Sequence, residues 1–280
     1  MSRPSCIRVR RYTRVCMDAE KGYLYEVTLD PRRRRARGRR LARLIPRYAF
    51  GCYCRWCAHP LPRSVAVCPA HSSDREYLNR TLAVGLYYTD SVKTGIGLLG
   101  NLLTDYILAL KQRRSYASVL GAAMALVVRE KVYGIGVEDI DVVTFVPKHP
   151  SELKMDEENE VRYNQAELLA RAASKHLRLR LERLVEKTAP LQLRGRGLHE
   201  RYKESKQVYH VLEEQADIIR DSRILLVDDV RTTGATGNTI AALLKKHGAR
   251  RVYLLVAGRA TYYDLVKEIV EEYGGDPEIG

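Results

Sequence analysis

The most constraining feature of the sequence is an apolar run that ends in two acidic residues and a Thr/Gly-rich turn. The run Ile224–Val227 has the length and composition of a buried strand, and Asp228 and Asp229 follow it directly. The turn then enters a segment with helical periodicity that begins at Thr236. Because ligands of open α/β sheets bind beyond the carboxyl ends of the strands, this strand–turn–helix unit predicts a binding site there.

The turn has the chemistry of a phosphate site. Backbone N–H groups converge in such a turn, and the helix dipole adds positive potential at the helix N-terminus. Gly234 allows a ligand to approach the backbone closely, and the Thr hydroxyls can donate further hydrogen bonds. A Walker-type phosphate loop is excluded because no Gly-Lys-Ser/Thr follows a Gly-rich turn here.

The two acids indicate what kind of phosphate ligand fits. Carboxylates repel a bare phosphate but accept hydrogen bonds from vicinal hydroxyls, so Asp228 and Asp229 favour a ribose 5-phosphate. In the competing interpretation the acids only cap the helix, and Thr232 and Thr233 only turn the chain. Capping needs one polar residue, whereas this segment holds two acids, three Thr and a Gly. We therefore favour the sugar-phosphate site.

Strands and helices alternate from residue 81 onward. Apolar residues recur at helical spacing within residues 99–110 and 119–127. Further expected elements are strands at Asp141–Val146, Arg223–Val227 and Arg251–Ala257, helices from Asn164 toward Val185, at Thr236–His247 and at Tyr263–Glu272, and a long loop or short hairpin at 189–209. This alternation predicts an α/β fold with a mainly parallel sheet flanked by helices on both faces.

A cysteine-rich segment precedes this region, since four of the six cysteines lie within Cys52–Cys68. Two close ligand pairs with short spacings are typical of a structural zinc site that has four protein ligands. The predicted Zn²⁺ ligands are Cys54, Cys57, Cys68 and His71. In the alternative ligand set, Cys52 or His59 replaces His71.

The first 50 residues carry most of the positive charge. They contain 15 Lys/Arg against four Asp/Glu, and the whole chain has a net charge of +14. Alternation within Cys6–Cys16 and Tyr23–Leu29 predicts a hairpin, and we interpret its two cysteines as core thiols. The Arg-rich run that begins at Pro31 offers little to bury, so we expect it to be mobile unless a polyanion binds.

Nucleic acid is the obvious polyanionic partner for this run, through counterion release and with little sequence preference. Aromatic residues are sparse within the run, so base stacking is not indicated. The alternatives are a solvated, partly disordered face, or an arm that grips an acidic surface of the same protein. The arginines concerned are Arg32–Arg35, Arg37, Arg39 and Arg40.

Several segments together resemble the ComF-type family of type I phosphoribosyltransferases, in the competence and amidophosphoribosyltransferase-like group. Ile224–Thr236 resembles their binding signature for 5-phosphoribosyl-1-pyrophosphate (PRPP). The other similar segments are the cysteine module, Ala109–Lys111 followed by Tyr116-Ala117, Val146–His149 and Arg162–Ala170. The resemblance spans roughly residues 52–260. It implies a phosphoribosyltransferase (Rossmann-like) sheet preceded by a small zinc ribbon or knuckle.

The resemblance also implies roles for individual residues. The two acids would bind the ribose hydroxyls, the turn would hold the 5-phosphate, and the loop Val146–His149 would contact pyrophosphate. The implied PRPP-binding residues are Asp228, Asp229, Val230, Arg231, Thr232, Thr233, Gly234, Ala235, Thr236, Lys148, His149 and Arg201, and the catalytic candidates are Asp228, Asp229, Lys111 and Lys148. Mg²⁺ bound to the pyrophosphate would neutralise the leaving group.

Two departures from the family pattern concern the rim of the site. The family usually has Phe where this chain has Tyr163, and a longer basic run where this chain has the acidic segment Asp156–Glu160. These differences bear on the charge of the rim and therefore on the acceptor.

We accordingly expect a basic N-terminal extension (residues 1–50), a zinc-binding module (51–75) and a phosphoribosyltransferase domain (76–280). The predicted activity is transfer of a 5-phosphoribosyl group from PRPP to a nitrogen acceptor, with release of pyrophosphate. The alternative is a non-catalytic PRPP-binding ComF-like protein that acts in DNA uptake or nucleic-acid processing. Too little chain precedes the cysteine module to form a glutaminase domain.

The remaining expectations concern location and assembly. The sequence contains neither an apolar run of membrane-spanning length nor a secretory signal at residues 1–15, so we expect no membrane association and a cytoplasmic location. The sheets of the resembled family often pair as dimers, which implies a homodimer.

Overall fold

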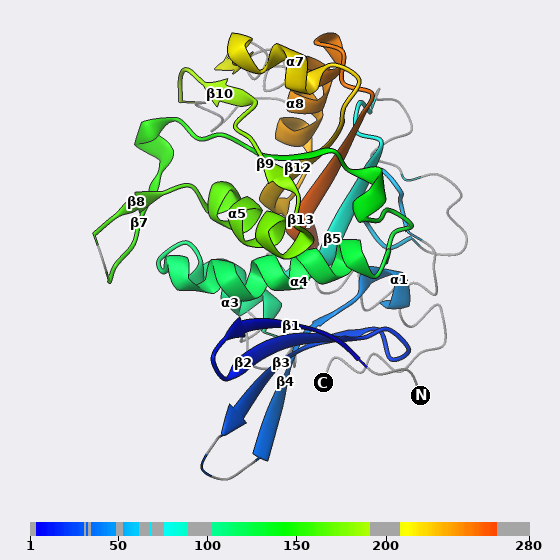
Figure 1. Cartoon of the computed structure of the whole chain (residues 1–280), viewed down its shortest axis with the longest axis vertical. Coiled ribbons are helices and arrows are strands. Elements are labelled where there is room, and N and C mark those ends of the chain that lie inside the picture. The colour runs from blue at the N-terminus through cyan, green and yellow to red at the C-terminus, as the bar shows by residue number, and fades with distance from the viewer. Residues whose placement is uncertain are drawn as a thin grey trace.

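The computed structural model describes residues 4–30, 32, 35–48, 53–61, 68, 76–88, 102–158, 160–190 and 208–261. Two main sheets organise these residues (Figure 1). One is a five-stranded sheet in the order β5-β13-β12-β6-β9, and its neighbouring strands are all parallel. The predicted α/β fold with a parallel sheet is therefore confirmed.

The five strands place β12 at the centre of the sheet. Their bounds are β5 Arg80–Tyr88, β6 Val142–Phe145, β9 Arg180–Leu181, β12 Arg223–Arg231 and β13 Arg251–Thr261. The described helices are α1 Ile45–Tyr48, α3 Leu103–Ala109, α4 Ala117–Arg129, α5 Gln165–Leu177, α7 Ala216–Ile219 and α8 Ala235–Lys246, with 3-10 turns η3 Arg114–Tyr116, η4 Val137–Asp139, η5 Pro150–Glu152 and η6 Glu213–Gln215.

Two small antiparallel ladders flank the parallel sheet. They are β7 Lys154–Met155 with β8 Arg162–Tyr163, and β10 Val185–Lys187 with β11 Tyr209–Val211. The second ladder brackets the long loop predicted at 189–209, most of which lies outside the described residues. The helix predicted at Tyr263–Glu272 also lies outside them.

Helix α5 begins as predicted but ends earlier than predicted. The Asn164 side chain caps it by accepting a hydrogen bond from the backbone N–H of Ala166 at 3.0 Å. The helix ends at Leu177, because Arg178 adopts a left-handed conformation with φ 58° and the chain then enters β9. The expected continuation toward Val185 is wrong, since apolar residues beyond the helix end alternate with period two and fit a strand edge.

The N-terminal residues form a four-stranded antiparallel sheet in the order β1-β2-β3-β4. Its strands are β1 Ser5–Arg10, β2 Thr13–Asp18, β3 Tyr23–Asp30 and β4 Arg35–Arg43. The sequence predicted one hairpin of two strands, whereas the structure has four strands in this region. A mobile Arg-rich run is also wrong for residues 35–43, because β4 pairs with β3 along its length and buries Leu41 and Ala42.

The two N-terminal cysteines are not free thiols as expected. Cys6 and Cys16 face each other across the β1–β2 pair and form a disulfide. The prediction was wrong because sequence spacing alone does not reveal cross-strand register. The disulfide ties the two strands at one end of the sheet.

Helix α4 joins the two sheets into one core. One side of α4 packs against β5, β13 and α5, while another packs against β1 and β2. Side chains from both sheets therefore belong to one continuous apolar cluster, which includes Ile7 and Val15 from the first and Val84 and Leu255 from the second. A helix that is covered on several sides must be apolar all round. Accordingly, every residue of Val119–Val128 in α4 is buried.

Among the described residues, no helix is long and apolar enough to cross a membrane.

Gly121 permits the close contact between α4 and α5. A methyl group added there would lie 2.3 Å from Cβ of Ala172. Gly121→Ala should therefore force the two helices apart and reduce the free energy of unfolding by about 1–3 kcal/mol, despite the higher helix propensity of alanine. Urea unfolding followed by circular dichroism measures this loss.

Gly38→Ala is the matched control, because no atom lies within 4 Å of the added methyl group. We expect it to change the unfolding free energy by less than about 0.5 kcal/mol. Equal effects of the two substitutions would contradict the packing role of Gly121.

Candidate functional site

The central strand β12 extends beyond its neighbour β6 and carries the two acids past that neighbour's end. β6 pairs with β12 only as far as Phe145 opposite Val227, whereas β13 continues alongside to Arg259 opposite Arg231. The predicted strand end at Val227 was therefore four residues early. Asp228 and Asp229 lie half-buried at this carboxyl edge, where parallel sheets bind their ligands.

The acids are held in a fixed arrangement by backbone hydrogen bonds. The N–H of Asp229 donates to Oδ1 of Asp228 at 2.9 Å, and the N–H of Val230 donates to Oδ1 of Asp229 at 2.8 Å. Burial, followed by the neighbouring charge of Asp229, raises the pKa of Asp228 well above its ordinary value, while the charge of Lys148 acts in the opposite direction. Two adjacent carboxylates thus compete for positive charge and hydrogen-bond donors.

The turn after β12 depends on Gly234. This residue adopts φ 84° and caps the N-terminus of α8. A Cβ at this position would also lie 2.4 Å from Nη2 of Arg231, so only glycine fits. The side chains of Thr232 and Thr233 are exposed, and Thr233 Oγ1 lies 3.4 Å from the N–H of Ala235. The turn therefore presents hydroxyls and helix N-terminal amides on the solvent side.

Arg231 supports this turn from inside the core. Its guanidinium donates from Nη1 to Thr81 Oγ1 at 2.9 Å and pairs through Nη2 with Glu76 at 3.4 Å. Both side chains of the ion pair are buried. A ligand contact from Arg231 would consequently come from its main chain. The sequence had not singled out Glu76, because its separation from Arg231 along the chain conceals the pairing.

The loop after β6 reaches the same edge of the sheet. The N–H of Val146 donates to the carbonyl of Val227 at 3.0 Å, and Asn164 Nδ2 donates to the carbonyl of Val146 at 2.9 Å. Lys148 donates through Nζ to the side chain of Gln165 and lies close enough to Asp228 to influence its charge. The structure thus places Lys148 near Asp228, and the roles of both residues in PRPP binding remain predictions.

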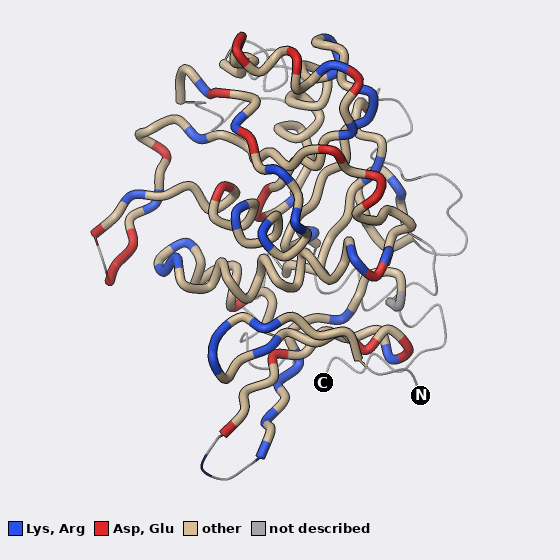
Figure 2. The backbone as a smooth tube through the Cα atoms, viewed as in Figure 1, with Lys and Arg blue, Asp and Glu red and all other residues tan. Residues whose placement is uncertain are grey.

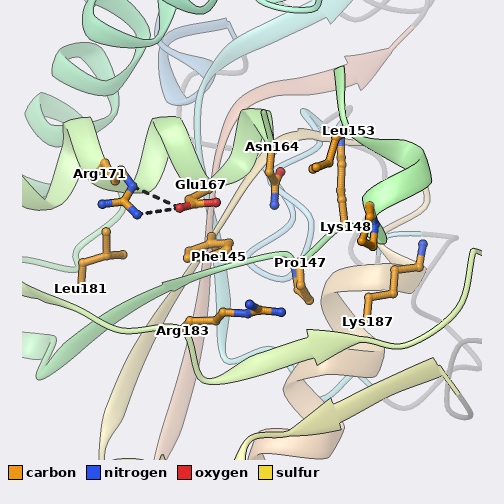
Figure 3. A pocket seen from close by; sticks show the side chains of 11 residues that line it. Phe145, Pro147, Lys148, Leu153, Asn164, Glu167, Arg171, Leu181, Arg183 and Lys187 are labelled. Carbon is orange, nitrogen blue, oxygen red and sulfur yellow. Dashed lines mark hydrogen bonds and ion pairs between the residues drawn. The ribbon is translucent and has the colours of Figure 1, made fainter. Parts of the chain in front are cut away.

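A cavity of about 490 Å³ adjoins this loop, between α5 and the β9–β10 segment (Figure 3). Its wall is rich in cationic side chains, two of which have acidic partners. Arg171 pairs with Glu167 at 2.7 Å, and Lys187 pairs with Glu152 at 2.6 Å. Figure 3 shows Arg183 extending below Pro147. The cavity can therefore accommodate an anionic or polar group next to Lys148.

The other predicted PRPP residues have different surroundings. His149 caps the turn η5, with Nδ1 2.8 Å from Ser151 Oγ. Lys111 follows the end of α3, directly after the C-cap residue Leu110. Arg201 lies outside the described residues. The roles of these three residues therefore remain predictions.

Tyr209 is a site neighbour that the sequence did not reveal. It is buried at the start of β11, with the charge of Asp228 nearby and a side-chain hydrogen bond to Thr236. Burial, then the negative charges of Asp228 and Glu152, raise the pKa of Tyr209. Tyr209 thus links the strand after the long loop to both the acid pair and the turn. A single tyrosine after a charged loop has no sequence pattern that would indicate a place near the acid pair.

The acidic segment at the site rim is tied to nearby arginines. Asp156 is buried, accepts a hydrogen bond from the N–H of Arg114 at 3.0 Å and pairs with the guanidinium at 3.5 Å. Glu158 lies 3.6 Å from Arg113. These acids occupy the tip of the β7–β8 hairpin, where the arginines offset their charge.

Three cysteines form a compact group, named here the sulfur cluster: Cys54, Cys57 and Cys68. Their sulfurs all lie within 4.8 Å of one another, and all three side chains are buried. The Cys57 and Cys68 sulfurs are 3.9 Å apart. Zn–S bonds of about 2.3 Å in a tetrahedron place sulfurs about 3.8 Å apart, so this group fits three ligands of a zinc ion.

The fourth ligand lies outside this group. His71 and Cys52 are not among the described residues. His59 has Nδ1 2.7 Å from the carbonyl of Pro60 and Nε2 3.4 Å from Thr261 Oγ1, and it does not belong to the sulfur cluster. The described geometry therefore gives no support to His59, and His71 remains the predicted ligand.

Arg259 supplies positive charge beside the sulfur cluster. A hydrogen bond from Cys54, together with the charge of Arg259, lowers the pKa of Cys57. Arg259 is itself buried and donates through Nη1 to the carbonyl of Arg231 at 3.1 Å. Three thiolates around one Zn²⁺ leave a net negative charge, which a buried guanidinium offsets.

Comparisons with known proteins give little guidance. A scan against protein-family models finds no match, and a search of curated proteins finds none. Among solved structures, the chain is similar to the allosteric regulatory enzyme of purine biosynthesis, with 17% identity, a TM-score of 0.33, and coverage of 57% of this chain and 33% of that one. It is also similar to a purine phosphoribosyltransferase from Pyrococcus horikoshii Ot3, with 15% identity, a TM-score of 0.28, and coverage of 51% and 87%.

The chain thus spans about one third of the length of the first of these proteins. Superpositions this loose have no weight as evidence of function, so the assignment that follows depends on the residues at the end of β12.

The sulfur cluster predicts one tightly bound zinc ion per chain. Elemental analysis of protein purified without chelator should find about one equivalent, and Co²⁺ substitution should give the intense visible absorption of a thiolate-rich tetrahedral site. Cys57→Ser should lose most of the metal and lower the melting temperature. The disulfide variant Cys6→Ser/Cys16→Ser is the control, and it should retain the metal. Metal-free wild-type protein would refute this site.

The raised pKa of Asp228 predicts a distinctive pH dependence of stability. The folded carboxyl keeps its proton at pH values where an unfolded aspartate has lost it, so its contribution to stability falls as the pH rises above about 4. Asp228→Asn should therefore raise the melting temperature of the ligand-free protein by a few degrees at pH 7–8, and by less toward pH 4. Asp217→Asn, at an exposed aspartate, is the control. A pH-independent difference would contradict the cause assigned here.

Proposed function

We propose that this protein is a phosphoribosyltransferase that binds PRPP at the carboxyl edge of β12 and transfers its 5-phosphoribosyl group to a nitrogen acceptor. One observation carries the proposal: the central strand β12 carries two adjacent carboxylates past the end of β6, and a glycine-dependent turn then leads into α8. A sugar that bears both hydroxyls and a phosphate is the ligand that matches both halves of this site.

Each part of the site has a separate role in the proposed complex. Asp228 and Asp229 accept hydrogen bonds from the ribose hydroxyls and hold the ring at the strand end. The hydroxyls and amides of Thr232–Thr236 bind the 5-phosphate, while Val230 and Arg231 contribute backbone. Lys148 and His149 face the pyrophosphate, and the charge of Lys148 also acts on Asp228. Arg201 and Lys111 are further candidate phosphate contacts.

The residues present fit a magnesium complex of the substrate. Carboxylate and phosphate oxygens are ligands that Mg²⁺ prefers, and Asp228 and Asp229 offer two adjacent carboxylates near the carboxyl end of β12. When bound, Mg²⁺ would neutralise the charge that grows on pyrophosphate as the bond to ribose C1 breaks. Lys148 supports the same leaving group by direct charge pairing.

The acceptor approaches ribose C1 from the side opposite the pyrophosphate. A nitrogen nucleophile suits this reaction, a pentosyl (glycosyl) transfer, because its lone pair can attack a centre with oxocarbenium character. The cationic cavity next to Lys148 favours a polar or anionic acceptor or leaving group over an apolar one. In the proposed complex residues 190–209, most of which lie outside the described residues, close over the site and exclude water.

The second candidate function is a PRPP-binding protein without transferase activity, in which the ligand regulates nucleic-acid handling in DNA uptake or processing. The basic N-terminal sheet favours this candidate, since transfer chemistry at β12 makes no use of it. Pyrophosphate release with candidate acceptors distinguishes the two: Mg²⁺-dependent turnover supports the enzyme, and tight PRPP binding without turnover supports the regulator.

Asp228→Asn/Asp229→Asn should abolish PRPP binding without unfolding the protein. Each lost charge-assisted hydrogen bond is worth about 1.5–3 kcal/mol, so the double variant should bind PRPP more than about 100-fold more weakly. Isothermal titration calorimetry with Mg²⁺ measures the affinity. Asparagine preserves the Oδ1 acceptors that fix the strand end, so folding should survive.

Asp217→Asn/Asp221→Asn is the charge-matched control, because Asp217 lies in α7 and Asp221 precedes β12, at the opposite end of that strand from the acid pair. Its affinity for PRPP should equal that of wild type. Unchanged PRPP affinity in the Asp228/Asp229 variant would remove the ribose assignment.

A further inference from the structure

The register of the N-terminal sheet gives it two chemically different faces. One face carries Ile7, Val15 and Met17, which are buried against α4 and the common core. The residues between them point to the opposite side, named here the outer face. Its cross-strand sets are Cys6–Cys16–Tyr25–Arg40, Arg8–Arg14–Val27–Gly38 and Asp18–Tyr23–Arg43.

The outer face combines aromatic rings with guanidinium groups. The rings of Tyr23 and Tyr25 have centroids 6.2 Å apart, and both side chains are half-buried. The guanidinium of Arg40 lies 4.4 Å from the centre of the Tyr23 ring, and that of Arg43 lies 5.8 Å from it. Pairing between β3 and β4 thus brings together tyrosines and arginines that lie far apart in the sequence.

The charge of this face is almost uniformly positive. Arg8 and Arg14 are exposed neighbours on paired strands, next to the Tyr25–Arg40 pair. Of the described residues on the outer face, Asp18 alone is acidic; it lies at the end of the sheet and pairs with Lys21 at 3.7 Å. Figure 2 shows further basic residues along β4 and at the β1–β2 turn.

Edge protection explains only part of this pattern. β4 is an edge strand, and charged residues on an edge prevent pairing with other chains, which accounts for Arg35, Arg37 and Arg39. The other edge strand, β1, carries Arg8, which edge protection also explains, but edge protection does not require Arg14 on the inner strand β2 or tyrosines interleaved with arginines on one face. That arrangement matches a ligand with both anionic groups and flat rings.

We propose that the outer face of the β1–β4 sheet binds single-stranded nucleic acid. Bases stack on Tyr25 and on the Tyr23–Arg40 pair, while Arg8, Arg14 and Arg43 neutralise phosphates. A single strand fits better than a duplex because its bases are free to stack, and stacking tolerates any base. An anionic membrane fits less well, since Tyr12 is the one large apolar side chain of the described sheet that is exposed.

The first test measures binding by the full-length protein. Fluorescence anisotropy with labelled 15-nucleotide oligo(dT), oligo(U) and a 15-base-pair duplex should show either or both single strands binding more tightly than the duplex. Single strands give a salt slope of about −0.7 for each neutralised phosphate, so the three phosphate-binding arginines predict about −2. The two oligonucleotides distinguish DNA from RNA as the preferred strand. Equal or tighter duplex binding, or equal competition by phosphatidylserine vesicles, would overturn the proposal.

Variants separate stacking from charge. Tyr25→Leu should weaken binding by at least about fivefold, and Tyr25→Phe, which keeps the ring, should restore most of it. Arg8→Gln/Arg14→Gln should reduce the magnitude of the salt slope by about 1.4. The charge-matched control Arg113→Gln/Arg220→Gln changes two exposed arginines elsewhere and should leave both quantities unchanged. An equal loss in this control would mean that only net charge matters and would refute the proposed face.

A measurement on the unaltered protein covers the case in which Tyr25→Leu unfolds the sheet. Photocrosslinking with 4-thiothymidine or 4-thiouridine oligonucleotides, followed by peptide mapping, should place the crosslinks within residues 5–43. Crosslinks confined to other segments would refute the proposal. PRPP binding enters none of these measurements, so their outcome is independent of the proposed transferase activity.

Discussion

The enclosure of α4 is the constraint on which the rest of the structure depends. This helix contacts the parallel sheet, α5 and the N-terminal sheet at once, so almost every side chain between Ala117 and Val128 is buried. Burial on all sides leaves no room for error in packing, and the α4–α5 crossing at Gly121 is correspondingly close. The N-terminal sheet is more basic than the rest of the chain. It nevertheless shares one apolar core with the α/β part.

The candidate site depends on the unequal lengths of three neighbouring strands. Because β6 stops early and β13 continues, β12 presents its acids at an open edge, while the buried pair of Arg231 with Glu76 fixes the turn that follows. The positive charge of Lys148 comes from a loop tied to β12 by one backbone hydrogen bond. The different strand lengths thus bring the acids of β12 and the positive charge of Lys148 to the same edge of the sheet.

Much of this arrangement could be predicted from short-range patterns. The strand–acid–turn–helix unit, the start of α5 at Asn164 and the proximity of three cysteines follow from residue types at fixed spacing. Features that depend on register or on distant partners could not be read in this way: the Cys6–Cys16 disulfide, the pairing of β4 with β3, the Tyr23–Arg40 contact and the neighbourhood of Tyr209. The length of β12 was predicted too short because its final residues are mostly polar, although their backbone still pairs with β13.

Arg259 connects two regions that otherwise have separate chemistry. Its guanidinium lies beside the sulfurs of the cysteine module and donates to the carbonyl of Arg231, three residues after Asp228. A change in the charge held by the sulfurs must therefore alter the electrostatic environment of the main chain that leads out of β12. If the cysteines hold a metal ion and the strand end holds a sugar phosphate, thermodynamic reciprocity requires that each ligand changes the affinity for the other by the same factor.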